Sequence, residues 1–557
     1  MSRFKLKYLF LFILVSVAIG GFVWTRSYLF TNMGVSLQRR IESLNLSGFN
    51  VRYDSISVDW IGNAIQVNNL LLEKNAYDTT CVYPEFISVG SVRAEGIGLF
   101  KLIFRKKLSI ETVKLERLRI ILREHSLMLL DSATKRENEF SLEVNQVSIR
   151  SAELNYVDSA KCKTIATIRT HIAASDLELD FHSDKPFRYQ ANLLTFDSAE
   201  INVPRQLYTF KVLKARMDFP GATLRIDTTK VIPHVSNVEF GRKFGYEIDR
   251  FEAVIPYVNF TGFGFSLPDT SRVKAGLAEI QFYLKVFRDK RLPFVKKQKL
   301  LPVAMLQDLP FRLVVDSLKV IKSYVQYEEV ADGMTEPGKI FFDNLYAVLL
   351  GLDNTTRSGH TRLSAHAKLQ GHGDLDLFVT FPLNPGKKST LKGSIRNFRL
   401  PEINSMLTPS TQVKVESGNM KEMTFGFTFN SIRSDGEIEL NYEDLKVISF
   451  KDEEKQKGNE PEKDNLKTFI MNTFIFKKKM DENVPEEKRT GEVGYLRDDN
   501  RSIFNFWVKS LVSGLKSAYN LDKVEARKTD KEIKQERRQE RREARRAKRS
   551  EKKKDRG

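Results

Sequence analysis

Three histidines, His360, His366 and His372, recur every six residues and form the pattern in this chain that comes nearest to a metal site. On a strand such residues share a face, but six residues cover about 20 Å. A single ion needs all its ligands about 2 Å away. Unless the chain turns between them, these histidines belong to a solvated strand face, and no metal site is predicted.

Other residue types that could do chemistry give no stronger signal. Asp374 and Asp376 alternate with leucines, which is typical of the polar side of a strand rather than an acid–base pair. The fragment Gly96-Ile-Gly98 lacks the third glycine of a dinucleotide fingerprint and is interpreted as a turn. The sequence has no phosphate loop, nucleophile elbow or His-Glu-x-x-His motif. We therefore predict no catalytic residue, no cofactor and no enzymatic activity.

The elements around these residues begin with an uncharged apolar run at 8–25. Eighteen residues of helix span about 27 Å, enough for a thin bilayer core. Arg3, Lys5 and Lys7 precede the run, so the N-terminus is predicted to be cytoplasmic and the rest to lie on the far side. The anchor residues would include Tyr8, Phe12, Leu14, Val17, Phe22 and Trp24. A cleaved signal peptide and a buried helix of a soluble protein are the alternatives.

Charge is concentrated at the other end of the chain. The formal net charge is +19, and residues 523–557 hold 17 Lys and Arg against 8 Asp and Glu, a net of +9. The first 522 residues therefore carry only +10 (19 − 9). The tail could be a solvated segment or bind anionic lipid. Because the topology places it outside the cytoplasm, nucleic acid is not predicted as a partner.

Between residues 49 and 450 the apolar residues follow a period of two. Phe49, Val51 and Tyr53 alternate with polar residues, and the pattern recurs at Val113/Leu115 and 425–429. Such alternation predicts strands with one apolar and one polar face. The main interruption is 285–307, which contains Pro293 and Pro302.

A helix is expected after Ser502, which would cap it. Its apolar face would carry Ile503, Phe504, Trp507, Leu511, Leu515 and Tyr519. Such a helix could lie in a membrane interface, cap the end of a groove, or dock on the β-rich body as a core helix. The two cysteines, Cys81 and Cys162, could form a disulfide or remain separate thiols.

The layout resembles the AsmA-like superfamily of envelope proteins in its Bacteroidetes-type form. The similarity starts with the anchor and continues through GFNVRYDSISVDW (48–60), NNLLLEKN (68–75) and SVGSVRAEGIGLFKLIFRKKLSIETVKLERLRIIL (88–122). A later segment, LKGSIRNFRLPEINSMLTPSTQVKVESGNMKEMTFGFTFN (391–430), resembles the C-terminal repeat of that family.

The resemblance implies a mainly β protein, with a transmembrane helix followed by an elongated, curved antiparallel sheet that forms an apolar groove. It implies anchoring in the bacterial inner membrane, a periplasmic body and a role in conveying phospholipid or in outer-membrane biogenesis. A scaffold without lipid, or a regulator of outer-membrane protein assembly with envelope protein partners, is the alternative. The candidate groove-lining residues are Val51, Val58, Leu115 and Phe427.

This interpretation assigns a role to each part of the chain. The expected parts are an N-terminus with its transmembrane segment (1–30), a juxtamembrane helix (31–48), an N-terminal groove half (49–285), an irregular connector (286–307), a C-terminal groove half (308–450), a linker with the last strands (451–500), an amphipathic helix (501–521) and a basic tail (522–557).

Overall fold

The computed structural model describes residues 49–59, 63–74, 86–98, 107–123, 140–158, 163–181, 188–266, 272–334, 336–411, 413–449 and 487–518. The predicted membrane anchor, the juxtamembrane helix, the basic tail and both cysteines lie outside these residues. The chain divides into two compact units, unit 1 (Met1–His234) and unit 2 (Val235–Gly557). Both are built mainly from strands, which confirms the predicted mainly-β class.

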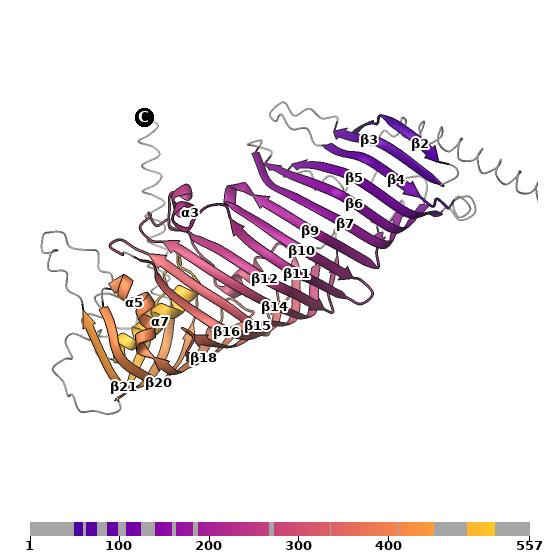
Figure 1. Cartoon of the computed structure of the whole chain (residues 1–557). Helices are drawn as coiled ribbons and strands as arrows, with labels where there is room; N and C mark the ends of the chain where they lie inside the picture. Colours follow the sequence, from indigo (N-terminus) through magenta and orange to yellow (C-terminus); the bar gives the residue numbers. More distant parts are fainter. Residues whose placement is uncertain are drawn as a thin grey trace, which may run out of the picture. The chain divides into compact units, whose positions relative to one another are not determined.

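Unit 1 is a sheet whose long strands lie side by side (Figure 1). Its strands are β1 (Phe49–Arg52), β2 (Ser55–Asp59), β3 (Ala64–Lys74), β4 (Phe86–Glu95), β5 (Lys107–Arg123), β6 (Phe140–Asp158), β7 (Lys163–Phe181), β8 (Arg188–Gln190), β9 (Leu193–Val203), β10 (Tyr208–Asp218) and β11 (Thr223–Pro233). Within unit 1, β5 and β6 pair in parallel and the other pairs are antiparallel. Both β1 and β2 pair with β3.

Unit 2 is also built mainly from strands, and it contains several helices. Its elements are α3 (Asn237–Phe244), β12 (Asp249–Thr261), β13 (Gly264–Ser266), β14 (Arg272–Asp289), α4 (Pro302–Gln307), β15 (Arg312–Val330), β16 (Gly338–Asp353), β17 (His360–Leu369), β18 (Gly373–Pro382), β19 (Ser389–Arg399), α5 (Asn404–Thr411), β20 (Val413–Phe429), β21 (Arg433–Ser449), β22 (Glu487–Leu496) and α7 (Ile503–Ala518). From β14 to β22 each strand pairs with the next.

The segment predicted to be an irregular connector at 286–307 has a different place in the structure. Strand β14 runs to Asp289, and β15 pairs with it in parallel. A parallel pair needs a long crossover, whereas an antiparallel pair closes with a short turn. Residues 290–311, which include α4, are that crossover. It lies inside unit 2, and the boundary between the units falls at His234 rather than here.

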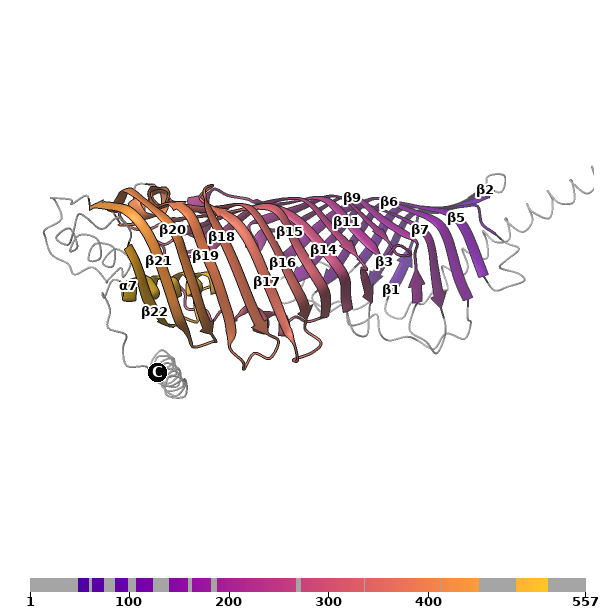
Figure 2. The same ribbon diagram turned by 90° about the horizontal axis from the view of Figure 1, so that it is seen from below.

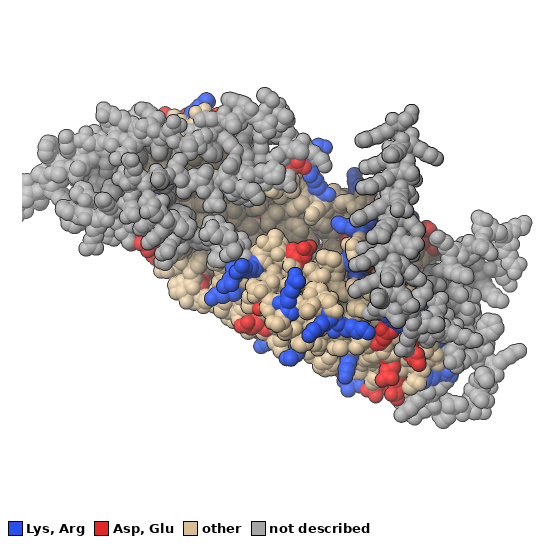
Figure 3. Space-filling view, turned by 180° about the vertical axis from the view of Figure 1, so that it is seen from behind, with Lys and Arg blue, Asp and Glu red and all other residues tan. Residues whose placement is uncertain are grey.

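The largest hydrophobic core lies at the C-terminal end of unit 2, where α7 packs against β22 and β21 (Figure 2). Its buried members include Phe425, Phe427 and Phe429 of β20 and Phe506 of α7. Among the described residues, both clusters of fully buried apolar side chains belong to unit 2. Figure 3 shows Lys and Arg interspersed with Asp and Glu on the visible face, as expected for a solvated surface of mixed charge.

Candidate functional site

Three rows of cross-strand neighbours traverse unit 1, and every residue in them is apolar. The first row contains Val51, Leu72, Ile87, Ile120, Leu154, Ile168, Ile201, Phe210 and Val231. The second contains Val58, Ile65, Ala94, Val113, Val147, Ala174, Leu194, Met217 and Leu224. The third contains Ile56, Val67, Val92, Leu115, Ile149, Ile172, Phe196, Ala215 and Ile226. At about 4.8 Å per strand, each row extends for roughly 38 Å.

These rows share one face of the sheet because the alternation shifts at the same level in most strands. In β5 the apolar residues Val113 and Leu115 are followed after three residues, not two, by Leu118, and then by Ile120. The residue in this gap, Arg117, has φ 54°. A single left-handed residue inside a strand offsets the alternation by one position, so the apolar side chains before and after it stay on one face. Asn69 of β3, Ser151 of β6 and Lys214 of β10 have the same conformation at the same level.

Most of the apolar face of unit 1 is only half-buried, although Ile65 of the second row and Val67 of the third are 7% and 9% exposed. Every side chain of the first row keeps an intermediate exposure in the structure. Among the described residues, the α-helices pack on strands of unit 2, and the one helix recorded against strands of unit 1 is the short 3-10 helix η2 (Pro204–Gln206), which contacts β7 and β10. A half-exposed apolar surface about nine strands wide is unusual for a protein surface in water, and such surfaces occur where a protein, a membrane or a ligand binds.

The opposite face of unit 1 carries ion pairs. Glu95 binds Lys114 Nζ at 2.9 Å and Arg93 Nε at 2.6 Å, and these hydrogen bonds hold the pKa of Glu95 below its usual range. Glu153 accepts hydrogen bonds from Asn155 and Arg169, which likewise lower its pKa. Charged groups that are paired but solvent-exposed define the water-facing side of the sheet.

Three of the four predicted groove-lining residues lie in these rows. Val51 belongs to the first row, Val58 to the second and Leu115 to the third. The structure therefore brings them onto one half-exposed face. Phe427 differs, because it is 4% exposed and lies within the closed core of unit 2. Its strand has the predicted alternation, but a helix covers its apolar side, so it does not line an open surface.

The predicted C-terminal helix is α7, and it docks on the sheet. Ile503, Trp507, Leu511 and Leu515 pack against the core of unit 2, while Phe504 is 69% exposed. Tyr519 lies outside the described residues. Phe506 was not part of the predicted face, yet it is 2% exposed and touches Phe429 in an edge-to-face contact with ring centroids 5.9 Å apart. The buried face of α7 is therefore rotated slightly from the predicted one, because it includes Phe506 and leaves out Phe504.

Two glycines let α7 approach β22 backbone to backbone. A Cβ on Gly491 would lie 2.1 Å from the carbonyl oxygen of Gly514, which no side chain tolerates. The serines of α7 complete the contact: Ser517 Oγ accepts from the backbone N–H of Glu492 at 3.0 Å, and Ser513 Oγ from that of Gly494 at 3.2 Å. These groups belong to the last strand of the sheet, so α7 protects an edge that would otherwise offer unpaired donors.

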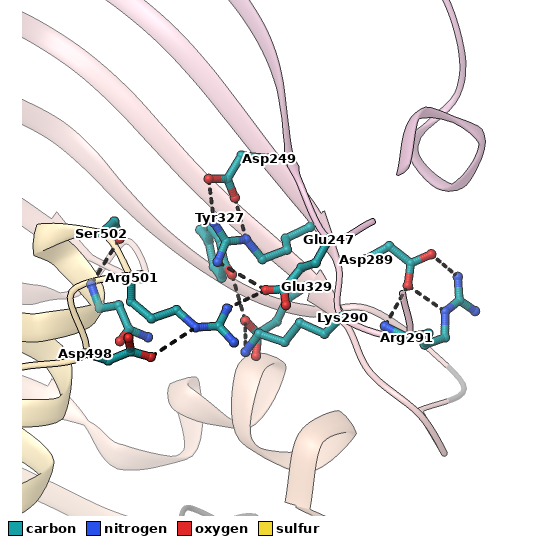
Figure 4. A network of polar contacts seen from close by, with 12 residues as sticks. Glu247, Asp249, Asp289, Lys290, Arg291, Tyr327, Glu329, Asp498, Arg501 and Ser502 are labelled. Atoms are coloured by element: carbon teal, nitrogen blue, oxygen red, sulfur yellow. Dashed lines mark hydrogen bonds and ion pairs between the residues drawn. The ribbon is translucent and has the colours of Figure 1, made fainter. Parts of the chain in front are cut away.

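A network of polar contacts also links the residues just before α7 to the start of β12 and the end of β14 (Figure 4). Arg501, just before α7, donates to Glu247 Oε1 at 2.6 Å, and Arg288 of β14 donates to Glu247 at 3.3 Å and to Asp249 at 2.6 Å. Burial by itself lowers the pKa of Arg288, but the hydrogen bond and charge of Asp249 outweigh it and raise that pKa. Burial raises the pKa of the Tyr327 hydroxyl.

The crossover joins this network through its backbone. The backbone N–H of Lys299 donates to the carbonyl oxygen of Asp499 at 2.7 Å, and the carbonyl oxygen of Lys299 accepts from Arg497 Nη2 at 2.6 Å. Burial lowers the pKa of the Lys299 ammonium group. The guanidinium of Arg501 also lies 3.7 Å from the ring centroid of Phe294. The crossover and the residues before α7, about 200 residues apart in sequence, are thus joined at the C-terminal end of unit 2. We call this end, where α7 covers the sheet, the closed end.

The residues considered for chemistry serve structural contacts. His366 Nδ1 lies 2.9 Å from Asp376, and His372 Nε2 lies 3.9 Å from Glu402. Asp374 accepts a hydrogen bond from Lys368 Nζ at 2.6 Å, which lowers the pKa of its carboxyl group. Within the described ranges, no three His, Cys, Asp or Glu side chains are grouped so that they could hold a metal ion.

Comparison with known proteins assigns no relative to this chain: neither a protein-family model nor a curated protein matches it. In the part of the chain that the structure describes, no helix has the length and apolar character needed to cross a membrane.

Proposed function

We propose that this chain is a membrane-anchored envelope protein whose apolar face in unit 1 binds phospholipid acyl chains and conveys lipid between membranes. The observation that carries the proposal is the set of three unbroken apolar rows across nine strands, of which the first is half-exposed along its whole length. An acyl chain moving along such rows stays in contact with apolar side chains and avoids a cost of about 25 cal/mol for each Å² exposed to water.

The proposed location in the cell and the proposed ligand rest on the sequence. The apolar run at 8–25 supports anchoring in the bacterial inner membrane, with the body in the periplasm. The resemblance to the AsmA-like superfamily supports lipid as the ligand and outer-membrane biogenesis as the wider role.

A second candidate function is a periplasmic scaffold that carries no lipid. The closed core under α7 favours it, because this end of the protein is packed like an ordinary domain. The two functions differ in one consequence. A lipid conduit must hold lipid on the apolar face of unit 1, whereas a scaffold would cover that face with protein.

Site-specific photo-crosslinking in cells distinguishes the two. A photoreactive amino acid at Leu115 is expected to capture phospholipid, because Leu115 lies in the third apolar row. The matched control is Glu116, its neighbour on the opposite, water-facing side, which is expected to capture none. Phe427 is a second control, since α7 and its neighbours bury it. Capture of protein but no lipid at Leu115, in a protein that still functions, would reject the conduit and favour the scaffold.

A further inference from the structure

The polar face of unit 1 contains a furrow with a volume of about 1500 Å³. It is lined by residues on β1, β3 to β7, β9 and β10 at the level where the strands kink. Each of these strands contributes neighbouring residues to the lining, among them Arg117 and Arg119 of β5 and Arg169 and His171 of β7. The charged wall residues Arg119, Glu153 and Lys211 each lie one position away from a residue of the first apolar row and so point to the opposite face, although the lining also includes Val51 of that row.

The furrow holds more positive than negative side chains. Its lining includes five basic residues, Arg52, Arg117, Arg119, Arg169 and Lys211, and three acidic ones, Asp54, Glu153 and Glu200, a net of +2 (5 − 3). All three acids are already engaged. Asp54 accepts from Asn69 Nδ2 at 2.6 Å, Glu153 from Arg169 Nε at 2.9 Å, and Glu200 lies 3.0 Å from Lys211 Nζ.

Two arginines at one end of the furrow have no such partner. Neither Arg52 nor Arg117 forms an ion pair with any residue that the structure describes. Both are exposed, and both line the furrow together with Ser88 of β4, a strand that lies between β1 and β5 in the sheet and whose Ser88 hydroxyl can donate a hydrogen bond. Guanidinium groups with unused donors bind phosphate oxygens in a bidentate way, which makes this end of the furrow suited to a phosphate group.

The position of Arg117 depends on Gly90. A Cβ built on Gly90 would lie 2.5 Å from Arg117 Nε and 2.8 Å from Nη2, so the guanidinium rests directly over the glycine. Gly90 and Arg117 lie between the pairs Val89 with Leu118 and Ser91 with Glu116, and the absence of a side chain on Gly90 leaves the space that the guanidinium occupies. Arg117 is also left-handed, with φ 54°, a conformation that favours Gly, Asn or Asp over Arg. The kink in the strand requires a left-handed residue at position 117, but it does not explain why that residue is an arginine.

We propose that this furrow is a binding site for a phosphate-bearing anion, held by Arg52 and Arg117 with Ser88 between them. The ligand is either a soluble phosphate compound or the headgroup of an anionic phospholipid presented by a membrane. The site is distinct from the proposed lipid surface, because Arg52, Ser88 and Arg117 belong to none of the three apolar rows.

Titration calorimetry of the purified full-length chain with inorganic pyrophosphate tests the site. Saturable binding is expected, and Arg117→Gln is expected to weaken it at least tenfold, because the variant loses a charge-assisted hydrogen bond to the anion. Gly90→Ala keeps every charge but displaces the guanidinium of Arg117, so this variant should also bind pyrophosphate more weakly than the parent. Because the atom in the way is the end of a flexible side chain, this variant should fold normally.

The control is Arg225→Gln on β11, which removes the same charge outside the furrow and should leave the affinity unchanged. Flotation with phosphatidylcholine vesicles with or without phosphatidylglycerol separates the two ligand sources. Binding that needs phosphatidylglycerol and both furrow residues identifies a lipid headgroup, and binding of pyrophosphate alone identifies a soluble phosphate. The proposal is overturned if neither probe binds, or if Arg117→Gln and Arg225→Gln weaken binding equally.

Discussion

The apolar face of unit 1 and the closed end of unit 2 are made from the same kind of sheet, but only one of them is covered. In unit 1 the row through Val51 and Ile120 is half-buried along its whole length. In unit 2 the row that contains Val379, Leu391 and Phe427 is 2–4% exposed. The strands differ little in pattern. What differs is α7, which packs on β22 and β21 and belongs to the same core cluster as the second row, whereas no α-helix joins the first row.

Strand alternation thus specifies an apolar face but not which part of the protein or which ligand contacts that face. A covering element turns such a face into a core, and its absence leaves a surface that can bind a ligand. In unit 2 the cover needs several fastenings: glycines for close approach, serines on the strand edge, and buried ion pairs around Glu247. Substituting a residue in any of these contacts tests whether the closed end can lose stability while unit 1 keeps it.

The largest expected effect comes from truncating a buried ring. Phe429 is 1% exposed and touches Phe381, Phe506 and Trp507. Phe429→Ala is expected to destabilise the closed end by about 3–5 kcal/mol, through lost burial and the cavity left behind. Ile120→Ala in unit 1 should cost only about 1 kcal/mol, because its side chain is half-buried in the folded chain. Hydrogen exchange resolved by segment measures both, and equal losses in the two variants would mean that the unit 1 face is covered in solution.

A smaller effect is expected from separating α7 from β22. Gly491→Val places a side chain where the carbonyl oxygen of Gly514 now lies and should destabilise the docked helix by about 1–3 kcal/mol. Proteolysis within α7 should accelerate while β5 and β6 stay protected. Gly426→Ala on β20 is the matched control, because its Cβ would make only an ordinary contact at 3.8 Å. If both variants resist protease like the parent, α7 is not held by this approach.

A third prediction concerns one buried hydrogen bond. Ser434 and Ser510 are both fully buried, and their hydroxyl oxygens lie 2.7 Å apart. Ser510→Ala should cost about 1–2 kcal/mol because Ser434 loses its partner without access to water. Adding Ser434→Ala should recover part of that loss. A double variant as unstable as the sum of the singles, measured by denaturant unfolding of the closed end, would contradict the pairing.

The smallest expected effect is a dependence on pH. The hydrogen bond from Arg291 holds the pKa of the Asp289 carboxyl below its usual range, and Arg169 with Asn155 does the same for Glu153 in unit 1. A depressed pKa means that the ionised carboxylate stabilises the fold above about pH 4, and that this contribution is lost as the pH falls through the folded-state pKa.

Both units should therefore weaken modestly below pH 4, in contrast to the first three changes, which act on the closed end. Asp289→Asn should remove part of this acid sensitivity in unit 2 and leave that of unit 1 intact. Segment-resolved hydrogen exchange at pH 7 and at pH 3, corrected for the intrinsic exchange rate, compares the two. An identical acid response of unit 2 in the parent and the variant would show that Asp289 does not contribute.

Part of the kinked architecture was present in the sequence but is easily overlooked. In β3, Ile65, Val67, Leu70 and Leu72 are spaced by two, three and two residues. The same spacing recurs at Val147, Ile149, Ala152 and Leu154 in β6, and at Phe210, Val212, Ala215 and Met217 in β10. Simple alternation treats each half as a separate short run. The repeated three-residue step marks one long strand with a left-handed residue inside it, and also marks where the furrow lies.

The sequence by itself determined the mainly-β class, the face on which Val51, Val58 and Leu115 lie, and the position of the last helix to within a few residues. These follow from local periodicity, since a period of two fixes which side chains share a face. Only the tertiary structure decided that Phe427 is core, that α7 docks through Gly491 and Gly514, and that residues 290–311 are a crossover. Those outcomes depend on contacts between segments up to 254 residues apart, such as Arg501 with Glu247, and no local pattern encodes which distant segment will cover an apolar face.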